Sequence, residues 1–257
     1  MSTANTSPVT PRSVGGVDVQ LVYAIGDIHG CYDLLRALLA KIAQDVAAKS
    51  DAATPILIFC GDYVDRGPDT ARVLDALCWL KRHAPYDVRF LKGNHEAVML
   101  DYVRDPAQTR DWMRFGGVET LQSYGVTPPS PEAAALEHLR ARDDLLERMP
   151  VAHLRFLEQL DLMLTVGDYA FVHAGIVPGR PLANQSEADL LWIRDEFLGS
   201  SDRHEKIVVH GHTWIGSSPE HLANRIGVDT GAYETGVLTC ARLEDGAVTF
   251  LSVNRAE

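Results

Sequence analysis

The sequence predicts an α/β fold in which helices cover a mostly parallel β-sheet. Three observations support this fold class. Short apolar runs that stop at or near a glycine recur at residues 21–25, 56–60 and 88–91, as buried strands do. Helical patterns separate these runs, and polar residues cluster directly after each of them. Strand, helix and strand therefore alternate, which predicts parallel strands whose polar clusters meet at one edge of the sheet.

The helical patterns consist of apolar residues at three- and four-residue spacing over residues 34–42 and 73–80. A helical insert is expected over about 97–160, because residues 131–149 are rich in Ala, Leu, Glu and Arg and prolines mark their start. The last third returns to strands, which we expect to close the sheet system in an antiparallel manner. These strands are predicted at residues 163–166, 169–172, 207–209, 225–228, 237–243 and 248–253, with a hairpin turn at Asp245 and Gly246.

The chain has 257 residues, enough for one large domain, which we expect at residues 18–257 after a disordered tail at residues 1–17. Its hydrophobic fraction of 46% is ordinary for a folded soluble protein. We expect neither a secretory leader nor a membrane span, because residues 1–16 have no continuous apolar segment and no apolar run approaches the roughly 20 residues that cross a bilayer. Widely spaced cysteines predict no disulfide framework and fit a reducing cytoplasm. They are Cys31, Cys60, Cys78 and Cys240.

The formal net charge of −11 disfavours binding to a nucleic acid, because a polyanionic backbone would be repelled. A membrane partner is not expected either. Phosphorylated substrates remain compatible with this charge, since bound cations would reverse the local electrostatic field.

Five short segments combine potential metal ligands with glycine turns. A single segment of this kind is more often only a turn, but five in this order indicate two divalent cations held side by side. The segments are residues 26–30 (Gly-Asp-Ile-His-Gly), 61–67 (Gly-Asp-Tyr-Val-Asp-Arg-Gly), 93–96 (Gly-Asn-His-Glu), 173–175 (His-Ala-Gly) and 210–213 (His-Gly-His-Thr).

Asp27 and His29 are separated by one residue, so in an extended backbone both side chains would leave on the same side and bind one cation. Asp62 follows the next strand, and its two oxygens could bridge two cations about 3.5 to 4 Å apart. Asp62 is therefore the expected shared ligand.

Asn94, His173 and either His210 or His212 would complete the ligands of the second cation. Carboxylate, amide and imidazole ligands without a thiolate suit Mn, Fe or Zn better than Ca. Two divalent metal ions are the expected cofactors.

Arg66 belongs to the second segment, and its guanidinium matches the geometry of phosphate oxygens. His95 directly follows Asn94. If Asp65 accepts a hydrogen bond from one ring nitrogen of His95, the other nitrogen can give a proton to a departing alkoxide. Water activated by the two cations can serve as the nucleophile.

These segments resemble the signature of the phosphoprotein phosphatase family of metallophosphoesterases, whose pattern is Gly-Asp-x-His-Gly, Gly-Asp-x-Val-Asp-Arg-Gly and Gly-Asn-His-Glu. Every position of these three is matched. The resemblance implies two facing mixed β-sheets flanked by helices, with the metals at one edge. It implies a proton donor at His95, supported by Asp65, and it selects His212 over His210. The implied metal ligands are Asp27, His29 and Asp62 for the first ion, and Asp62, Asn94, His173 and His212 for the second.

Residues 191–195 (Leu-Trp-Ile-Arg-Asp) resemble the segment that carries a second phosphate-binding arginine in bacterial and phage members of this family. This resemblance points to Arg194, with Arg180 and Arg203 as nearby alternatives. Residues 229–231 (Asp-Thr-Gly) also match this branch.

The expected function is therefore metal-dependent hydrolysis of phosphomonoesters, foremost phosphoserine and phosphothreonine in proteins, by in-line attack of metal-activated water. Arg66 and Arg194 would neutralise the phosphate oxygens while His95 protonates the leaving oxygen. One alternative is symmetrical hydrolysis of dinucleoside polyphosphates, whose enzymes share much of the signature. Another is a catalytically weak module that binds phosphorylated ligands.

Aromatic residues near the predicted helices could line a substrate groove, but such residues usually fill a core. We therefore expect Trp112, Phe115 and Tyr124 to be buried. The helical insert and residues 178–184 are expected to set specificity.

Overall fold

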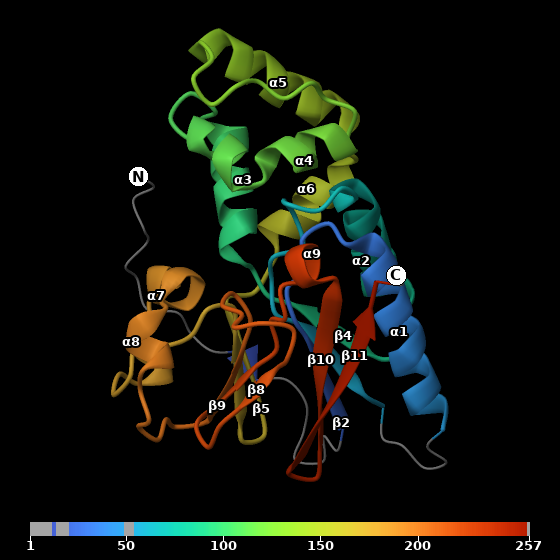
Figure 1. Cartoon of the computed structure of the whole chain (residues 1–257), viewed down its shortest axis with the longest axis vertical. Coiled ribbons are helices and arrows are strands. Elements are labelled where there is room, and N and C mark those ends of the chain that lie inside the picture. The colour runs from blue at the N-terminus through green and yellow to red at the C-terminus, as the bar shows by residue number, and fades with distance from the viewer. Residues whose placement is uncertain (1–11, 14–20, 49–53, 256–257) are drawn as a thin grey trace.

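The structure is a computed structural model that describes residues 12–13, 21–48 and 54–255. Most of the tail expected over residues 1–17 lies outside these ranges. Among the described residues, the strands form two mixed sheets that face each other, with helices on the outer sides (Figure 1). The predicted α/β fold class is confirmed.

The first sheet has the strand order β11-β10-β2-β3-β4. Strands β2, β3 and β4 pair in parallel, as predicted, and β10 is antiparallel to both β2 and β11. The strands are β2 (Leu21–Ile25), β3 (Ile56–Phe59), β4 (Asp87–Phe90), β10 (Val237–Glu244) and β11 (Ala247–Asn254).

The second sheet has the strand order β1-β5-β6-β7-β9-β8. The expected antiparallel arrangement of the last third is wrong for its central strands, because β6, β7 and β9 are parallel. Helices between β6 and β7 carry the chain back across the sheet, and such a crossover permits parallel pairing. The strands are β1 (Arg12–Ser13), β5 (Met163–Val166), β6 (Tyr169–Val172), β7 (Ile207–His210), β8 (Glu220–His221) and β9 (Arg225–Gly227).

Helices α1 (Tyr32–Ala47) and α2 (Thr70–His83) lie along the outer face of the first sheet (Figure 1). Helices α7 (Glu187–Trp192) and α8 (Asp195–Leu198) cover the second sheet, after the short 3-10 segment η2 (Leu182–Asn184). A further group of helices stands beyond one end of the sheets, and the short α9 (Ala232–Thr235) lies beneath it (Figure 1). This group comprises α3 (Asn94–Arg104), the 3-10 segment η1 (Arg110–Phe115), α4 (Gly117–Ser123), α5 (Ala135–Arg148) and α6 (Val151–Glu158).

Alternate residues of β2 point to opposite faces of the first sheet. Val22 and Ala24 join Phe171 of β6 in the core between the sheets, whereas Tyr23 and Ile25 face the helices. Both faces of the strand are therefore buried, which explains why its sequence is apolar throughout rather than alternating.

The predicted hairpin turn is also confirmed. Asp245 and Gly246 both have positive φ, as a tight two-residue hairpin turn requires, and they connect β10 to β11. All four cysteines are buried and unpaired. Among the described helices, none combines the length and the apolar composition that crossing a membrane requires.

Candidate metal centre

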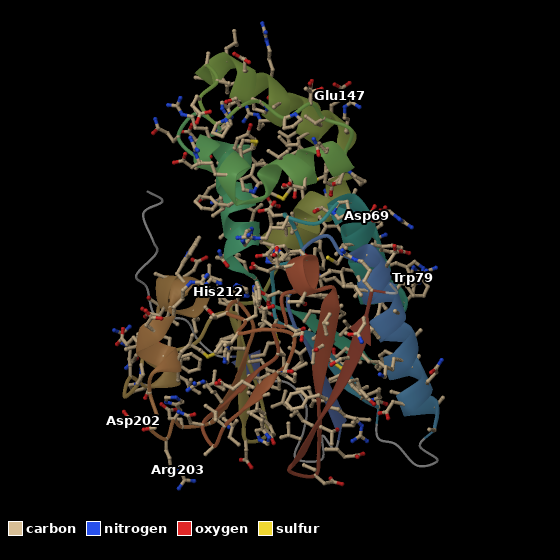
Figure 2. The ribbon with its side chains drawn as sticks, in the orientation of Figure 1. Asp69, Trp79, Glu147, Asp202, Arg203 and His212 are labelled. Atoms are coloured by element: carbon tan, nitrogen blue, oxygen red, sulfur yellow. The ribbon has the colours of Figure 1, made fainter. Side chains whose placement is uncertain are left out.

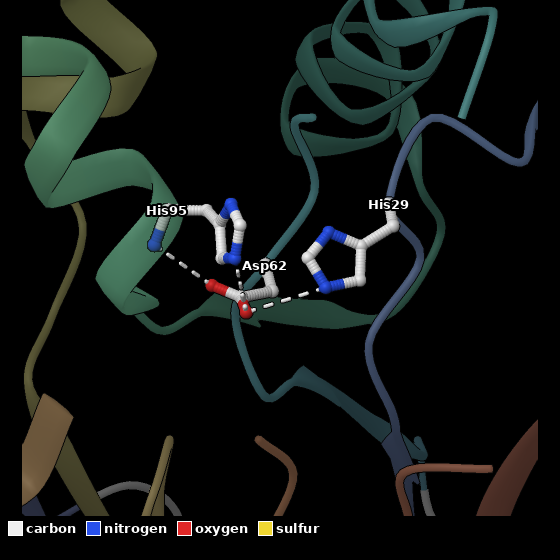
Figure 3. Close-up of side chains that lie close together, drawn as sticks. All are labelled: His29, Asp62 and His95. Carbon is white, nitrogen blue, oxygen red and sulfur yellow. Dashed lines mark hydrogen bonds and ion pairs between the residues drawn. The ribbon is translucent and has the colours of Figure 1, made fainter. Parts of the chain in front are cut away.

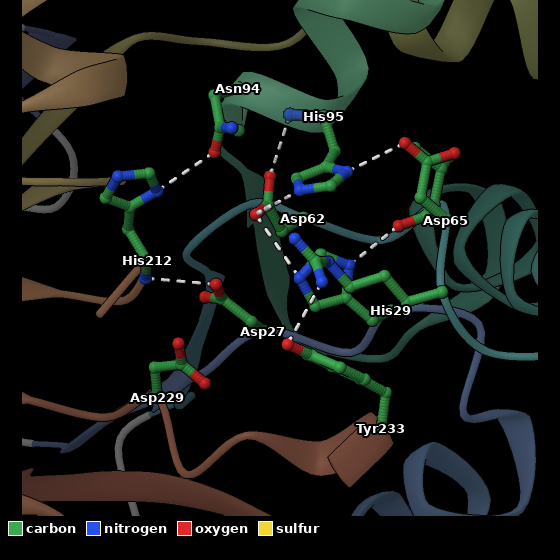
Figure 4. A network of polar contacts seen from close by, with 12 residues as sticks. Asp27, His29, Asp62, Asp65, Asn94, His95, His212, Asp229 and Tyr233 are labelled. Carbon is green, nitrogen blue, oxygen red and sulfur yellow. Dashed lines mark hydrogen bonds and ion pairs between the residues drawn. The ribbon is translucent and has the colours of Figure 1, made fainter. Parts of the chain in front are cut away.

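The five predicted segments meet at one edge of the two sheets. Segments 26–30 and 61–67 follow β2 and β3, and segment 93–96 opens helix α3. Segments 173–175 and 210–213 follow the parallel strands β6 and β7 of the facing sheet. Parallel strands end at the same edge, so their loops bring these polar side chains together (Figure 4).

The backbone at this edge is unusual. Among the described residues, six non-glycine residues have positive φ, and one of these is the hairpin residue Asp245. Such conformations cost about 1–3 kcal/mol each and persist where the surrounding structure holds them. The expected extended backbone from Asp27 to His29 is therefore wrong, because the chain turns at His29 with a φ of 44°. The other five residues are His29, Asp62, Asp65, Arg66 and His212.

Asp62 occupies the middle of the candidate site. Its Oδ2 lies 3.5 Å from Nε2 of His29, and its Oδ1 lies 3.4 Å from Nε2 of His173. Its Oδ1 also accepts a 3.1 Å hydrogen bond from the backbone N–H of His95 (Figure 3). One carboxylate thus faces histidines from two different segments, which is the geometry that a bridging ligand requires.

Asn94, His173 and His212 converge on the second side of Asp62. Oδ1 of Asn94 lies 2.9 Å from Nε2 of His173 and 2.9 Å from Nδ1 of His212. The two ring nitrogens are 3.2 Å apart. Asp62, His173 and His212 can each offer one ligand atom to a single cation.

On the first side, the residues that can offer ligand atoms to one cation are His29, Asp62 and His95. Asp27 lies beside this group rather than within it. Its Oδ2 accepts a 3.0 Å hydrogen bond from the backbone N–H of His212, and its Oδ1 is buried without a hydrogen-bond partner (Figure 4).

The residues present fit a pair of divalent cations. Nδ1 of His29 and of His173 each bonds a backbone carbonyl oxygen, at 2.8 and 2.9 Å, so the Nε2 lone pairs point toward oxygens of Asp62. No proton lies between these nitrogen atoms and the oxygens of Asp62 to form a hydrogen bond, so both would be free to bind a cation placed between them. The buried Oδ1 of Asp27, which has no hydrogen-bond partner, supports the same conclusion.

Electrostatics at this edge favours bound positive charge. Burial, followed by the charges of Asp229 and Asp62, holds the pKa of Asp27 well above its usual range. Burial lowers the pKa of His173 to about 4, so this imidazole is neutral and able to bind a metal at neutral pH. A cation would offset the repulsion among the buried carboxylates.

His95 and Asp65 form the predicted pair, with Nδ1 of His95 2.7 Å from Oδ2 of Asp65. Asp65 also accepts hydrogen bonds from Nε1 of Trp112 at 2.8 Å and from Oγ1 of Thr120 at 2.7 Å. Burial alone would lower the pKa of His95, but the charge of Asp62 and the hydrogen bond and charge of Asp65 raise it to about 9.

Two of the four arginines considered above line a cavity over these groups. Arg66 does so while donating a 3.1 Å hydrogen bond to the hydroxyl of Tyr233, and Arg194 lines the same cavity. Arg180 instead pairs with a carboxylate of helix α7. Arg203 is not among the described residues that line the cavity, and Figure 2 shows it near the far end of the sheets.

The cavity has a volume of about 560 Å³. Phe115 lines it and is 52% exposed, so the prediction that Phe115 packs in the core is wrong. Trp112 and Tyr124 are buried as predicted.

Of the two histidines in segment 210–213, only His212 lines this cavity. His210 instead packs its ring against Phe197, with the ring centroids 5.1 Å apart.

Sequence reasoning gave no role to Glu96, although it belongs to a recognised segment. Its carboxylate accepts hydrogen bonds from the backbone N–H groups of Asp62, Tyr63, Val64 and Gly93. It also missed that Trp112 holds Asp65 and that Asp229 lines the cavity. The Asp-Thr-Gly segment after a strand was a signal for Asp229. No sequence pattern reveals that Glu96 accepts hydrogen bonds from the loop after β3, or that Trp112 donates one to Asp65.

Comparison with known proteins matches residues 21–237 to the family model described as calcineurin-like phosphoesterase. The chain is 29% identical over 230 residues to serine/threonine-protein phosphatase 1 of Salmonella typhimurium, covering 87% of this chain and 92% of that protein. It is 33% identical over 174 residues to the symmetrical bis(5'-nucleosyl)-tetraphosphatase of Dechloromonas aromatica, covering 65% of this chain and 50% of that protein. The crystal structure of a putative diadenosine tetraphosphatase shares the fold, with a TM-score of 0.65 and 21% identity over 96% of this chain and 98% of that one.

Proposed function

Because this chain belongs to the calcineurin-like phosphoesterase family, we propose that it removes phosphate from phosphoserine and phosphothreonine in proteins with the help of two divalent metal ions. The observation that carries the proposal is the position of Asp62. Its carboxylate faces His29 on one side and His173 on the other, and Asp62 lines the same cavity as Arg66 and Arg194. The similarity to a protein phosphatase along nearly the whole chain supports this substrate class.

The proposed ligands are Asp27, His29, Asp62, Asn94, His173 and His212. Their oxygen and nitrogen atoms favour Mn, with Fe or Zn as alternatives. When bound, such ions polarise phosphate oxygens and lower the pKa of water to near neutrality.

The remaining side chains bind the substrate and handle a proton. Arg66 and Arg194 line the cavity and would neutralise the phosphate oxygens, which carry more charge in the transition state. Asp65 holds Nδ1 of His95, which leaves Nε2 free to present a proton to the leaving oxygen. Trp112 donates to Asp65 and so keeps the carboxylate in place.

A second candidate function is hydrolysis of dinucleoside polyphosphates. The cavity of about 560 Å³ is larger than a phosphoserine side chain needs. Phe115 and Trp192 line it with 52% and 49% of their surface exposed, and such rings can stack on a nucleobase. We rank this function second, because residues 64–67 (Val-Asp-Arg-Gly) and 93–96 (Gly-Asn-His-Glu) resemble the protein phosphatases more closely than the dinucleoside polyphosphate hydrolases.

Metal-free protein reconstituted with Mn²⁺ tests the ranking. We expect kcat/KM for a phosphoserine peptide to exceed that for diadenosine tetraphosphate by at least about tenfold, and Asp62→Asn to abolish both activities. Faster release of ADP from the tetraphosphate would reverse the ranking. Binding of Mn²⁺ and of phosphopeptide without turnover of either substrate would instead identify a module that only binds phosphorylated ligands.

A further inference from the structure

Asp229 is a buried carboxylate to which the proposed function assigns no role. It follows β9, is only 6% exposed and lines the cavity. Its Oδ1 accepts a 2.9 Å hydrogen bond from the backbone N–H of Gly231, where the chain turns with a φ of 65°. This turn fixes the Asp229 side chain in one orientation.

The backbone brings Asp229 next to the first predicted segment. A Cβ atom at Gly26 would lie 2.3 Å from the carbonyl oxygen of Val228 and 3.3 Å from Cα of Asp229. Only glycine permits this approach. It places the carboxylates of Asp27 and Asp229 near each other (Figure 4). After burial, the charge of Asp229 is the largest cause that raises the pKa of Asp27.

This arrangement is costly without a cation. Asp27 is 2% exposed, and its Oδ1 has no hydrogen-bond partner. The charges that shift the pKa of Asp27 are those of the carboxylates Asp229, Asp62 and Glu96, and all of them raise it. Buried carboxylates of this kind are normally paired or coordinate a metal.

Resting on the proposed function, we propose that Asp229 belongs to the metal centre. It makes one half of the centre, meaning one of the two cation positions with its ligands, rich in carboxylate oxygen. Asp27, Asp62 and Asp229 supply this half together with His29, whereas the other half contains two imidazoles. Oxygen-rich sites suit hard ions such as Mn²⁺ and Mg²⁺, and imidazole-rich sites suit Zn and Fe as well. The two halves should therefore differ in their affinity for Mn²⁺.

The variant Asp229→Asn tests this inference, since asparagine has the same size and keeps an oxygen that can accept from Gly231. Metal-free protein is titrated with Mn²⁺ by calorimetry, and its melting temperature is measured with and without Mn²⁺. We expect two equivalents in the wild type and at least tenfold weaker binding of one of them in the variant. The melting temperature of the metal-free variant should equal or exceed that of the wild type, because a buried repulsion is removed, while its rise with Mn²⁺ should be smaller.

The matched control is Asp245→Asn, which removes one charge at an exposed hairpin turn. Asparagine tolerates the positive φ of this position. It should bind Mn²⁺ as the wild type does. Unchanged affinity of Asp229→Asn for both equivalents would overturn the inference. The inference would also be overturned if the metal-free variant melted at a lower temperature than the wild type but its melting temperature rose equally on adding Mn²⁺. That result would show that Asp229 has a purely structural role. If Asp229→Asn does not fold, Asp229→Ser is titrated under the same criteria.

The two proposals fail in different ways. A wild type that binds two Mn²⁺ ions but cleaves no phosphoester contradicts the proposed function and leaves the role of Asp229 intact. An active wild type whose Asp229→Asn variant binds Mn²⁺ normally contradicts only the role of Asp229. A wild type that binds no Mn²⁺ contradicts both.

Discussion

The carboxylate of Glu96 accepts a 2.7 Å hydrogen bond from the backbone N–H of Tyr63. It also accepts from the N–H groups of Asp62 and Gly93, at 2.9 and 2.8 Å. One buried side chain at the start of α3 therefore holds the loop after β3, where the central candidate ligand lies. The strained backbone of that loop, with a φ of 52° at Asp62, depends on this support.

Replacing Glu96 by alanine should destabilise the protein by about 3 kcal/mol or more, because several buried N–H groups lose their acceptor and each costs about 1–3 kcal/mol. Urea denaturation measures this change. Glu96→Gln should cost less, since it keeps one oxygen. Glu147→Gln on the exposed face of α5 is the control and should leave the midpoint unchanged. Equal midpoints for Glu96→Ala and the wild type would show that the loop does not need this carboxylate.

Trp112→Phe should lower kcat by about tenfold. This loss is typical of removing a hydrogen bond that orients a residue acting at the site. The phenyl ring keeps most of the packing, but the 2.8 Å hydrogen bond to Asp65 disappears, and Asp65 positions His95. Steady-state kinetics on a phosphopeptide measures the effect. The control is Trp79→Phe, because Trp79 is 59% exposed on α2 and should tolerate the change. A kcat for Trp112→Phe equal to that of the control would contradict this role.

The parallel pairing of β2, β3 and β4 was predictable from the sequence, because three short and largely apolar runs alternate with helical patterns and each ends at or near a glycine. The predicted run at residues 21–25 coincides with β2, for example. The conformation of the first segment was not predictable. His29 turns to positive φ while its backbone N–H donates to the carbonyl oxygen of Asp62 at 2.9 Å, a contact between residues far apart in sequence.

Phe115 shows a different limit. Its aromatic side chain at the end of η1 suggested a core position, but the chain reverses at Gly116 with a φ of 110° and leaves the ring at the cavity. The parallel pairing of β6 and β7 was also missed, because residues 173–206 carry no pattern that reveals a crossover. Local patterns thus predicted elements and motifs, while contacts between distant segments decided the orientation of individual side chains.

His95→Asn should lower kcat on a phosphoserine peptide by roughly 10²–10⁴-fold, the usual contribution of a general acid, while Mn²⁺ content stays unchanged. The loss should be smaller on an aryl phosphate, because that leaving group needs less help from a proton. Kinetics on both substrates and metal analysis check this expectation. Equal losses on the two substrates would contradict the role of His95 as proton donor.

Asp62→Asn should differ from His95→Asn by losing both metal and nearly all activity, because Asp62 faces both candidate halves of the metal centre. Metal analysis after dialysis separates the two variants. Wild-type cleavage of the aryl phosphate by Asp62→Asn would contradict the proposed mechanism.

Arg194→Ala should raise the inhibition constant of inorganic phosphate by at least about tenfold, because Arg194 lines the cavity with Nη1 3.0 Å from Oγ1 of Thr213. Arg180→Ala is the matched control. Arg180 is close in sequence but pairs with Asp189 on α7, so its loss should leave phosphate inhibition unchanged. The same shift in both variants would mean that a general loss of positive charge, rather than contact at the cavity, weakens phosphate binding.

Arg194→Lys separates charge from shape at the same position. A lysine keeps the positive charge but cannot present two parallel N–H groups to a phosphate, and its ammonium group bonds as a single point. We therefore expect an inhibition constant between those of the wild type and Arg194→Ala. Full recovery by lysine would show that Arg194 acts only through its charge, and a value equal to that of Arg194→Ala would show that the guanidinium geometry supplies the whole effect.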